Sequence, residues 1–275
     1  MALNQTDLRK GGLDVQYAPV LRNSSRVTSV LRLVFVLVCL SWVVQAQSQS
    51  RNIVCRPELS ASHRESLANK LRSISGWARL DFDSVGTLQL GNRNEIVGGS
   101  QTARELLTMA LSGPNVLVIE DASDRADVVF ARVIEGRWTR GAQGKPPVRL
   151  VLLDFADFKH VVGDNDARVA FNEAWALLHE IAHVVHNSAD ADANKGVGEC
   201  EGLINKMRRE CGVAERSEYF FNYFPGQESS RFNTRFVRLA FDLKSSNSNK
   251  SKRIWIMWDG AVVGGLDNSR QVASK

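Results

Sequence analysis

The sequence lacks an apolar run long enough to span a membrane, a strong excess of charge of one sign, and any internal repeat. Its most apolar stretch, LVFVLVCLSWVVQA from Leu33 to Ala46, has 14 residues, whereas a membrane-spanning helix needs about 20. The first 46 residues contribute +3 of the formal charge of +5, which leaves too little positive charge to indicate a nucleic-acid-binding surface. With 44% hydrophobic residues in 275, the chain can bury a core as one large or two small domains.

The apolar stretch has the features of the central region of a signal peptide. Basic residues precede it, Val44 and Ala46 supply a small-residue cleavage pattern, and polar QSQS follows. We expect residues 1–46 to be a signal peptide whose true start lies downstream, near Val27 or Val30, because the preceding segment is long. The mature chain is then secreted or periplasmic and keeps no stable membrane span. The alternative is an uncut N-terminal anchor that holds the protein outside the cytoplasm.

Removal of that segment leaves Cys55, Cys200 and Cys211, an odd number for an oxidising compartment. We expect one disulfide and one free thiol. Cys200 and Cys211 cannot pair if both lie on one straight helix, because eleven residues span about 16 Å. Cys55 is therefore expected to pair with one of them.

The spacing of apolar residues predicts both helices and strands, so the expected fold class is α+β. Residues 47–275 are expected to form a single domain with a small mixed sheet. The predicted elements, in chain order, are a helix ending at Gly76, a hairpin around Gly86, a helix from about Thr102 to Gly113, the strands NVLVIED, DVVFARVIEG and VRLVLLD, a long helix from about Asp166, the helix ECEGLINKMRRECG, and a C-terminal β-hairpin formed by RFVRLAFDL and RIWIMWD.

Three of the five histidines fall in the segment AWALLHEIAHVVHN on the long predicted helix. His179 and His183 are four residues apart, so their side chains lie on one helix face and can bind one zinc ion. Glu180 between them can reach a water molecule at the metal and act as general base. His186 is expected to lie a turn beyond the metal. This HExxH pattern predicts a metal centre rather than a helix with capped or solvated histidines.

A catalytic zinc site has three protein ligands and one open position, so a third ligand is needed. Glu199 and Glu201 follow on the next predicted helix, across a polar loop. We favour Glu201, because Asn205 lies four residues further and could hydrogen-bond a zinc-binding imidazole. Glu199 remains the alternative ligand, and both glutamates could instead be residues favoured by the helix N-terminus.

Over about 120 residues, the segments GGSQTARELLTMALSG, HEIAHVVHN and INKMRRECGVAERSEY resemble zinc metallopeptidase domains of Rhs-type secreted toxins and a related type III effector protease family. The resemblance includes a run in which Asn205, Arg208, Arg209, Glu210, Gly212, Arg216 and Tyr219 match. It implies a zincin-like domain of gluzincin type, with an active-site helix and a third-ligand helix. The acidic ligand departs from the family pattern, because Ile204 occupies the position directly before Asn205.

The expected function is a secreted zinc peptidase that hydrolyses peptide bonds in a protein or peptide substrate. Zinc would polarise the scissile carbonyl and activate water, and Glu180 would transfer the proton. Tyr219 or Tyr223 could donate a hydrogen bond to the developing oxyanion, and Tyr219 is our choice. The alternative is a secreted, non-catalytic binding module stabilised by zinc, which a fourth protein ligand would favour.

Overall fold

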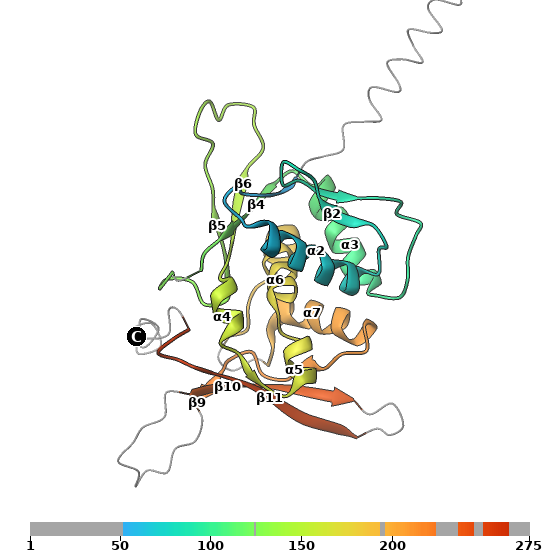
Figure 1. Cartoon of the computed structure of the whole chain (residues 1–275), viewed down its shortest axis with the longest axis vertical. Helices are drawn as coiled ribbons and strands as arrows, with labels where there is room; N and C mark the ends of the chain where they lie inside the picture. The colour runs from blue at the N-terminus through green and yellow to red at the C-terminus, as the bar shows by residue number, and fades with distance from the viewer. Residues whose placement is uncertain (1–51, 124, 193–195, 224–235, 245–249, 264–275) are drawn as a thin grey trace, which may run out of the picture. The chain divides into compact units, whose positions relative to one another are not determined.

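The structure, a computed structural model, describes residues 52–263 except 124, 193–195, 224–235 and 245–249 (Figure 1). Ser50–Lys275 form one compact unit. The expected signal peptide, residues 1–46, lies outside the described residues. In the part of the chain that is described, none of the helices has the length and apolar character that crossing a bilayer requires.

The expected α+β class is confirmed, with helices and several small sheets. The helices are α2 (Ala61–Ser75), α3 (Gln101–Ser112), α4 (Phe155–Lys159), α5 (Asn165–Val169), α6 (Glu173–His186) and α7 (Gly198–Glu210). The strands are β1 (Ile53–Cys55), β2 (Leu80–Phe82), β3 (Leu88–Leu90), β4 (Val116–Asp121), β5 (Ala131–Glu135), β6 (Val148–Leu153), β7 (Val162–Gly163), β8 (Glu215–Arg216), β9 (Asn222–Tyr223), β10 (Phe236–Lys244) and β11 (Ser251–Asp259).

The main sheet is mixed and has the strand order β1-β4-β6-β5. β1, β4 and β6 run parallel, while β5 is antiparallel to β6 with Val133 opposite Val151. β5 therefore stands at the edge of the sheet, and in the described chain it pairs only with β6. Helices α2, α3 and α6 lie on one side of this sheet (Figure 1).

Helix α6 lies at the centre of the packing. It contacts α2, α3, α7 and the strands β5 and β6, and its apolar residues Trp175, Leu178 and Ala182 are buried in the largest core cluster. The apolar spacing that predicted a helix with one internal face is thus explained by burial of that face. His179 and His183 follow this buried face toward the C-terminal end of α6, and both side chains are partly buried.

A second core cluster lies beneath the C-terminal hairpin. β10 and β11 pair over their full length, from Phe236 opposite Asp259 to Lys244 opposite Ser251, as the sequence predicted. Trp258 and Phe241 from this hairpin are fully buried against α5 and the chain that precedes α6. The hairpin therefore covers the base of the molecule below α5 and α7 (Figure 1).

Two expectations are wrong. The helix predicted from Asp166 onward is broken, because Asn172 adopts an extended conformation and its side chain caps α6 by accepting from Ala174 N–H at 3.0 Å. The expected disulfide is also absent, since Cys55, Cys200 and Cys211 are all free thiols. Each lies in a separate environment, Cys55 in β1, Cys200 beside His179, and Cys211 against the backbone of Ile74.

Candidate metal centre

The histidine pair sits in the middle and last turn of α6. His179 and His183 are one turn apart and their ring centroids are 4.8 Å from each other. Asn187 is the C-cap of helix α6 and has a left-handed backbone with φ of 51°. Asparagine tolerates this conformation better than most residues. The chain therefore leaves the helix directly after His186, the exposed last helical residue, and turns back toward the two imidazoles.

The Nδ1 atoms of both imidazoles are held by acceptors. Nδ1 of His183 lies 2.8 Å from the backbone carbonyl of Ser188, and Nδ1 of His179 lies 3.3 Å from Glu201 Oε2. A carbonyl oxygen can only accept, so Nδ1 of His183 carries the hydrogen. Metal-binding histidines characteristically use one ring nitrogen in this way, which leaves the other for the metal.

The two Nε2 atoms converge on one oxygen. Asp190 Oδ1 lies 3.1 Å from Nε2 of His179 and 3.2 Å from Nε2 of His183. Asp190 comes from the loop between α6 and α7, and its side chain is 45% exposed. Two imidazoles and a carboxylate thus meet at one point at the edge of solvent.

Cys200, in the first turn of α7, is close to the same point. The ligand atoms of His179, His183 and Cys200 all lie within 4.8 Å of one another, so this group could hold a metal ion. The thiol is fully buried and donates to the backbone carbonyl of His179 at 3.2 Å. It is a fourth potential ligand from a position that the sequence analysis considered only for a disulfide.

Gly198 holds the Asp190 loop against α7. Its φ is 78°, and a Cβ atom there would lie 2.4 Å from the backbone nitrogen of Ala191 and 2.8 Å from the carbonyl carbon of Asp190. Only glycine allows this backbone conformation together with this close approach. The backbone N–H of Cys200 also donates to Ala189 at 3.3 Å, so the loop is fixed on both sides of Asp190.

Glu201 occupies a different place from the one expected of a metal ligand. Its Oε1 accepts from Arg208, its Oε2 lies 3.0 Å from Arg216 Nη1, and the same Oε2 faces Nδ1 of His179. The side chain is buried, and the two guanidinium groups and His179 lower its pKa well below the ordinary value against the effect of burial. Both oxygens are engaged, so Glu201 orients an imidazole from behind instead of facing the two Nε2 atoms.

The residues around Glu201 form a buried polar network. Asn205 was expected to hydrogen-bond an imidazole, but its contacts lie elsewhere. Its Oδ1 accepts from Arg208 at 2.9 Å and from the backbone N–H of Arg216 at 2.8 Å. Arg208 also donates to the carbonyl of Ala170 at 2.9 Å. Asn205, Arg208 and Arg216 therefore support His179 through Glu201 and do not face the two Nε2 atoms.

Tyr219 is at the site, as expected from its place in that run. Its ring stacks on His179 with centroids 6.3 Å apart, and its hydroxyl hydrogen-bonds Asp190. Burial and the Asp190 charge raise the pKa of Tyr219, so the phenol stays protonated and can donate. Tyr223 lies in β9; its side chain is outside what the structure describes. Glu199, the alternative ligand, is exposed.

Glu180 lies beside β5 and lines the same cavity as His179 and Glu201. It is buried, and the backbone of Val133 lies within hydrogen-bonding reach of its carboxylate. Burial raises the pKa of Glu180, while the charges of His179 and His183 oppose that rise. A carboxylate with a raised pKa takes up a proton more readily than an ordinary glutamate, which is the property that a general base needs.

The candidate site carries charges of both signs. Burial disfavours a charged His179, but contacts with Asp190, Cys200 and Glu201 raise its pKa to about 12. Contacts with Asp190 and Cys200 raise the pKa of His183 to about 10. Despite partial burial, hydrogen bonds from His179, His183 and Tyr219 hold the pKa of Asp190 far below its usual range.

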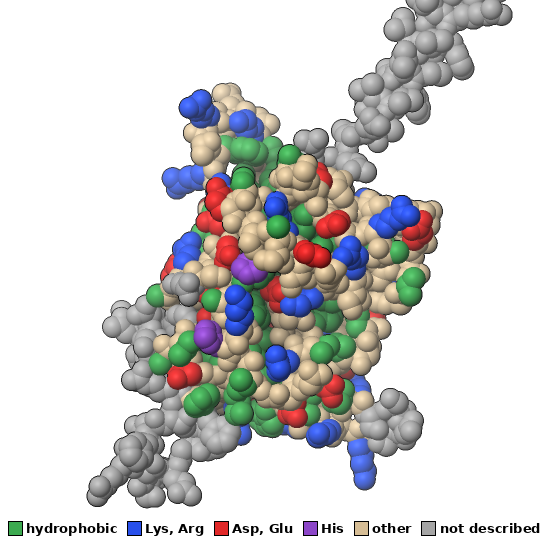
Figure 2. Space-filling model, in the orientation of Figure 1, with side chains coloured by type: hydrophobic (Ala, Val, Ile, Leu, Met, Phe, Trp, Pro, Cys, Tyr) green, Lys and Arg blue, Asp and Glu red, His purple; other side chains and the backbone are tan. Residues whose placement is uncertain are grey.

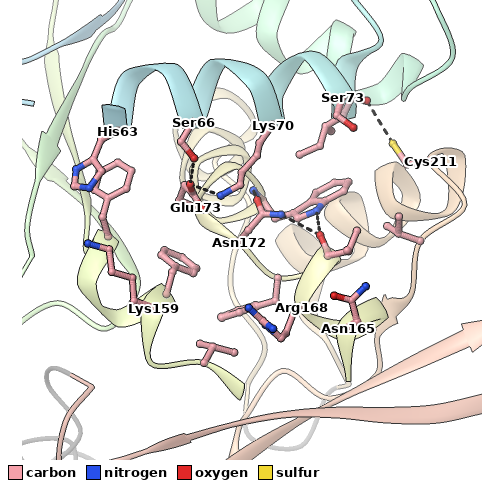
Figure 3. A pocket seen from close by; sticks show the side chains of 18 of the residues that line it. His63, Ser66, Lys70, Ser73, Lys159, Asn165, Arg168, Asn172, Glu173 and Cys211 are labelled. Carbon is pink, nitrogen blue, oxygen red and sulfur yellow. Dashed lines mark hydrogen bonds and ion pairs between the residues drawn. The ribbon is translucent and has the colours of Figure 1, made fainter. Parts of the chain in front are cut away.

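Two cavities lie along α6. One, of about 310 Å³, is lined by His179, Glu180 and several aromatic residues. The other, of about 710 Å³, lies between α2, α4 and α5 on the far side of Trp175, and there Glu173 accepts from Ser66 and Lys70 (Figure 3). The larger cavity contains no histidine pair, so the smaller one is the cavity of the candidate site.

Asp190 and Cys200 were not predicted from the sequence as residues of the site. A signal for Asp190 was present, because the loop NSADADAN places two aspartates shortly after His183. Comparisons of the chain with protein-family models, with curated proteins and with solved structures each found no match. The resemblance to toxin and effector metallopeptidases therefore stays a prediction.

Proposed function

We propose that this protein is a zinc-dependent peptidase in which His179, His183 and Asp190 bind the metal and Glu180 is the general base. The observation that carries the proposal is the convergence of both Nε2 atoms on Asp190 Oδ1, with each Nδ1 held by an acceptor. In this assignment Asp190 replaces Glu201 as the third ligand.

The donor set fits zinc. Zinc bonds of about 2.0–2.1 Å in tetrahedral geometry place two ligand atoms about 3.3 Å apart. The Nε2–Oδ1 distances of 3.1 and 3.2 Å match this separation. Two imidazoles and one carboxylate are also a usual ligand set for catalytic zinc, which keeps one position open.

The roles of the chain's own residues follow from their positions. Zinc, when bound, would lower the pKa of water and polarise a carbonyl. Glu180 would accept the proton of the attacking water and return it to the leaving amine. Tyr219, a protonated phenol beside the site, would turn its single O–H from Asp190 to the oxygen on which negative charge develops. Glu201 and the carbonyl of Ser188 would keep the imidazoles in place.

The edge strand β5 supports a peptide as the substrate. Its outer edge has no strand partner in the described chain, and its residue Val133 lies beside Glu180. An extended peptide could add to this edge by backbone hydrogen bonds. That placement would bring a scissile bond next to the general base and the metal.

Cys200 favours a rival function, a non-catalytic module stabilised by zinc. A thiolate joining His179, His183 and Asp190 would give four protein ligands, the arrangement of structural zinc sites. The rival requires Cys200 to bind the metal tightly. Cys200→Ser separates the two, because a structural site would lose zinc and a catalytic site would keep both zinc and activity.

The test of the proposal compares wild type with Glu180→Gln. Zinc per chain is measured on the purified protein, and cleavage of a peptide mixture is followed by mass spectrometry. Glu180 is not one of the proposed metal ligands, so the variant should keep its zinc while the rate falls by about 10²–10⁴. Glu199→Gln, at an exposed position of α7, is the matched control and should cleave like wild type. Equal rates in wild type and Glu180→Gln would refute Glu180 as the base.

The proposal includes that the protein is exported and that its partner is a protein or peptide and not a nucleic acid. The candidate signal peptide supports export, although it lies outside the described residues. On the face shown in Figure 2, acidic and basic side chains are interspersed, and this mixture supports a protein or peptide substrate over nucleic acid.

A further inference from the structure

The larger of the two cavities is separate from the candidate metal centre. Its volume is about 710 Å³, and residues of α2, α4, α5 and the start of α6 line it (Figure 3). None of the proposed zinc ligands is among the described residues of this lining. Binding sites for small organic molecules have volumes of about 300–1,000 Å³. The cavity therefore has the size of a second binding site, with a ligand of its own.

Aromatic rings give this cavity an apolar surface. The ring of Phe155 is held by His63, which stacks on it with centroids 4.2 Å apart. The indole Nε1 of Trp175 donates to the carbonyl of Val169 at 3.0 Å, so this ring has a partner for its one polar atom. Two further rings are partly exposed and accessible to a ligand. They are Phe158 and Phe171.

Positive charge predominates in the lining. Lys70, Lys159 and Arg168 supply three cations. Among the described residues that line the cavity, Glu173 is the only acid. Glu173 is buried and accepts from Lys70 and from Ser66, so its charge is compensated by that of Lys70. The charges of Lys159 and Arg168 remain uncompensated within the lining.

Lys159 and Arg168 are available to bind a ligand. In the part of the chain that the structure describes, neither side chain makes an ion pair or a hydrogen bond. Both residues are exposed, so an anion can reach them without displacing other groups of the protein. They lie on the α4 and α5 side of the cavity, across from Lys70 on α2 (Figure 3). Guanidinium and ammonium groups are the usual partners of carboxylates in proteins.

We propose that this cavity binds a small organic anion with an apolar body, such as a medium-chain carboxylate. The carboxylate pairs with Lys159 and Arg168, and the apolar body lies on the aromatic rings. A cationic ligand is repelled by the uncompensated charge, and a neutral one leaves that charge without a partner. The inference does not rest on the proposed peptidase function, because the cavity contains none of the proposed zinc ligands.

Binding of anilinonaphthalenesulfonate, an anionic aromatic dye, tests the site without zinc or cleavage. The dye is titrated into the full chain and followed by its fluorescence, and the neutral dye N-phenylnaphthylamine is titrated in parallel. Lys159→Gln combined with Arg168→Gln should weaken binding of the anionic dye at least about tenfold, because two contacts to its charge are lost. The neutral dye should bind this variant as it binds wild type.

Arg93→Gln combined with Lys252→Gln is the matched control. It removes the same two charges from exposed positions outside the cavity lining, and it should bind the anionic dye like wild type. Substitutions at exposed positions such as these four seldom affect folding. An equal loss of affinity in both double variants would show a response to net charge alone and would overturn the proposal. So would the lack of saturable binding to wild type, or unchanged binding in the cavity variant.

Displacement of the anionic dye tests the chemical class of the ligand. Octanoate should displace it from wild type. Octanol has the same apolar chain without the charge, and acetate has the charge without the chain, so both should require at least about tenfold higher concentrations. Displacement by octanol or by acetate at the concentration of octanoate would show that the cavity binds only an apolar chain or only an anionic group, and either result would overturn the proposal.

Discussion

At the scale of single residues, the Nδ1 contacts decide what the histidine pair can bind. The carbonyl of Ser188 and the carboxylate of Glu201 occupy one nitrogen of each ring, so only the Nε2 atoms can face a metal. Asp190 stands where both of these atoms point. The choice of Asp190 over Glu201 therefore follows from the direction of the rings, which sequence spacing alone does not reveal.

We expect Asp190→Asn to weaken zinc binding at least about 100-fold, because it removes an anionic ligand and leaves only the two imidazoles. Competition with a chromophoric chelator measures this affinity. Asp192→Asn makes the same chemical change two residues away in the same loop and should bind zinc like wild type. Zinc affinity unchanged in Asp190→Asn would return the third-ligand role to Glu201 or Cys200.

The zinc content of a Glu201 variant can be interpreted only together with the variant's free energy of unfolding. Glu201→Gln leaves the buried guanidinium of Arg208 and that of Arg216 without their counter-charge, and breaking a buried ion pair typically costs about 3–5 kcal/mol. Loss of zinc in a destabilised Glu201 variant would not identify a ligand. Loss of zinc would identify Glu201 as a ligand only if the variant unfolds at the same denaturant concentration as wild type.

At the scale of elements, Glu210 joins the end of α7 to the start of α3. It accepts from the hydroxyl of Ser100 at 2.6 Å, from the backbone N–H of Thr102 at 3.0 Å and from its hydroxyl at 2.7 Å. Ser100 is the N-cap of α3, and a carboxylate at a helix N-terminus is stabilising. The contact fixes α7, and with it Cys200 and Glu201, against the helical layer.

Glu210→Gln should lower the free energy of unfolding at pH 7 by about 1 kcal/mol, a modest value because the side chain is exposed. Burial acts to raise the pKa of Glu210, but the hydrogen bonds from Ser100 and Thr102 outweigh it and lower that pKa below 4.5. The stabilisation is therefore present above pH 4.5 and is lost as the pH falls through the folded-state pKa. Urea unfolding at pH 7 and pH 3 measures the difference from wild type, which should shrink at pH 3; a constant difference would contradict the charge-based explanation.

The elements with a strong apolar period were predictable, and the connections between them were not. α2, α3, α6, α7 and the C-terminal hairpin follow from helical or alternating spacing, because burial of one face sets that pattern. The break before α6 depends on one side-chain cap at Asn172, which overrides a continuous helical period. The position of Asp190 depends on Asn187 and Gly198, whose left-handed backbones turn the loop, and no period records such a turn.

At the scale of the whole molecule, the candidate metal centre joins parts that are separate in the chain. The histidines come from α6, Asp190 from the following loop and the supporting carboxylate from α7, while β5 and the C-terminal hairpin close the cavity beside Glu180. These groups meet only in the folded chain. A metal that binds them therefore binds the native state and stabilises it relative to the unfolded chain.

Zinc should raise the melting temperature, and should do so more at pH 8.5 than at pH 6. In the protein without zinc, contacts with Asp190 and Cys200 raise the pKa of His183 from 6.5 to about 10. A raised pKa means that this stabilisation is complete below pH 6.5 and is lost as the pH rises toward 10. Zinc needs neutral imidazoles, so its affinity rises over the same range.

Both effects widen the gap between zinc-loaded and chelator-treated protein as the pH increases. Zinc at about 100 times its dissociation constant contributes about 2.7 kcal/mol, or roughly 5–10 °C for a domain of this size. Scanning calorimetry with zinc and with chelator at pH 6, 7 and 8.5 measures the gap. Asp190→Asn, run in parallel, should show little shift at any of the three pH values. A gap that is largest at pH 6 would show that zinc does not compete with protons for His179 and His183, and the ligand assignment would fail with it.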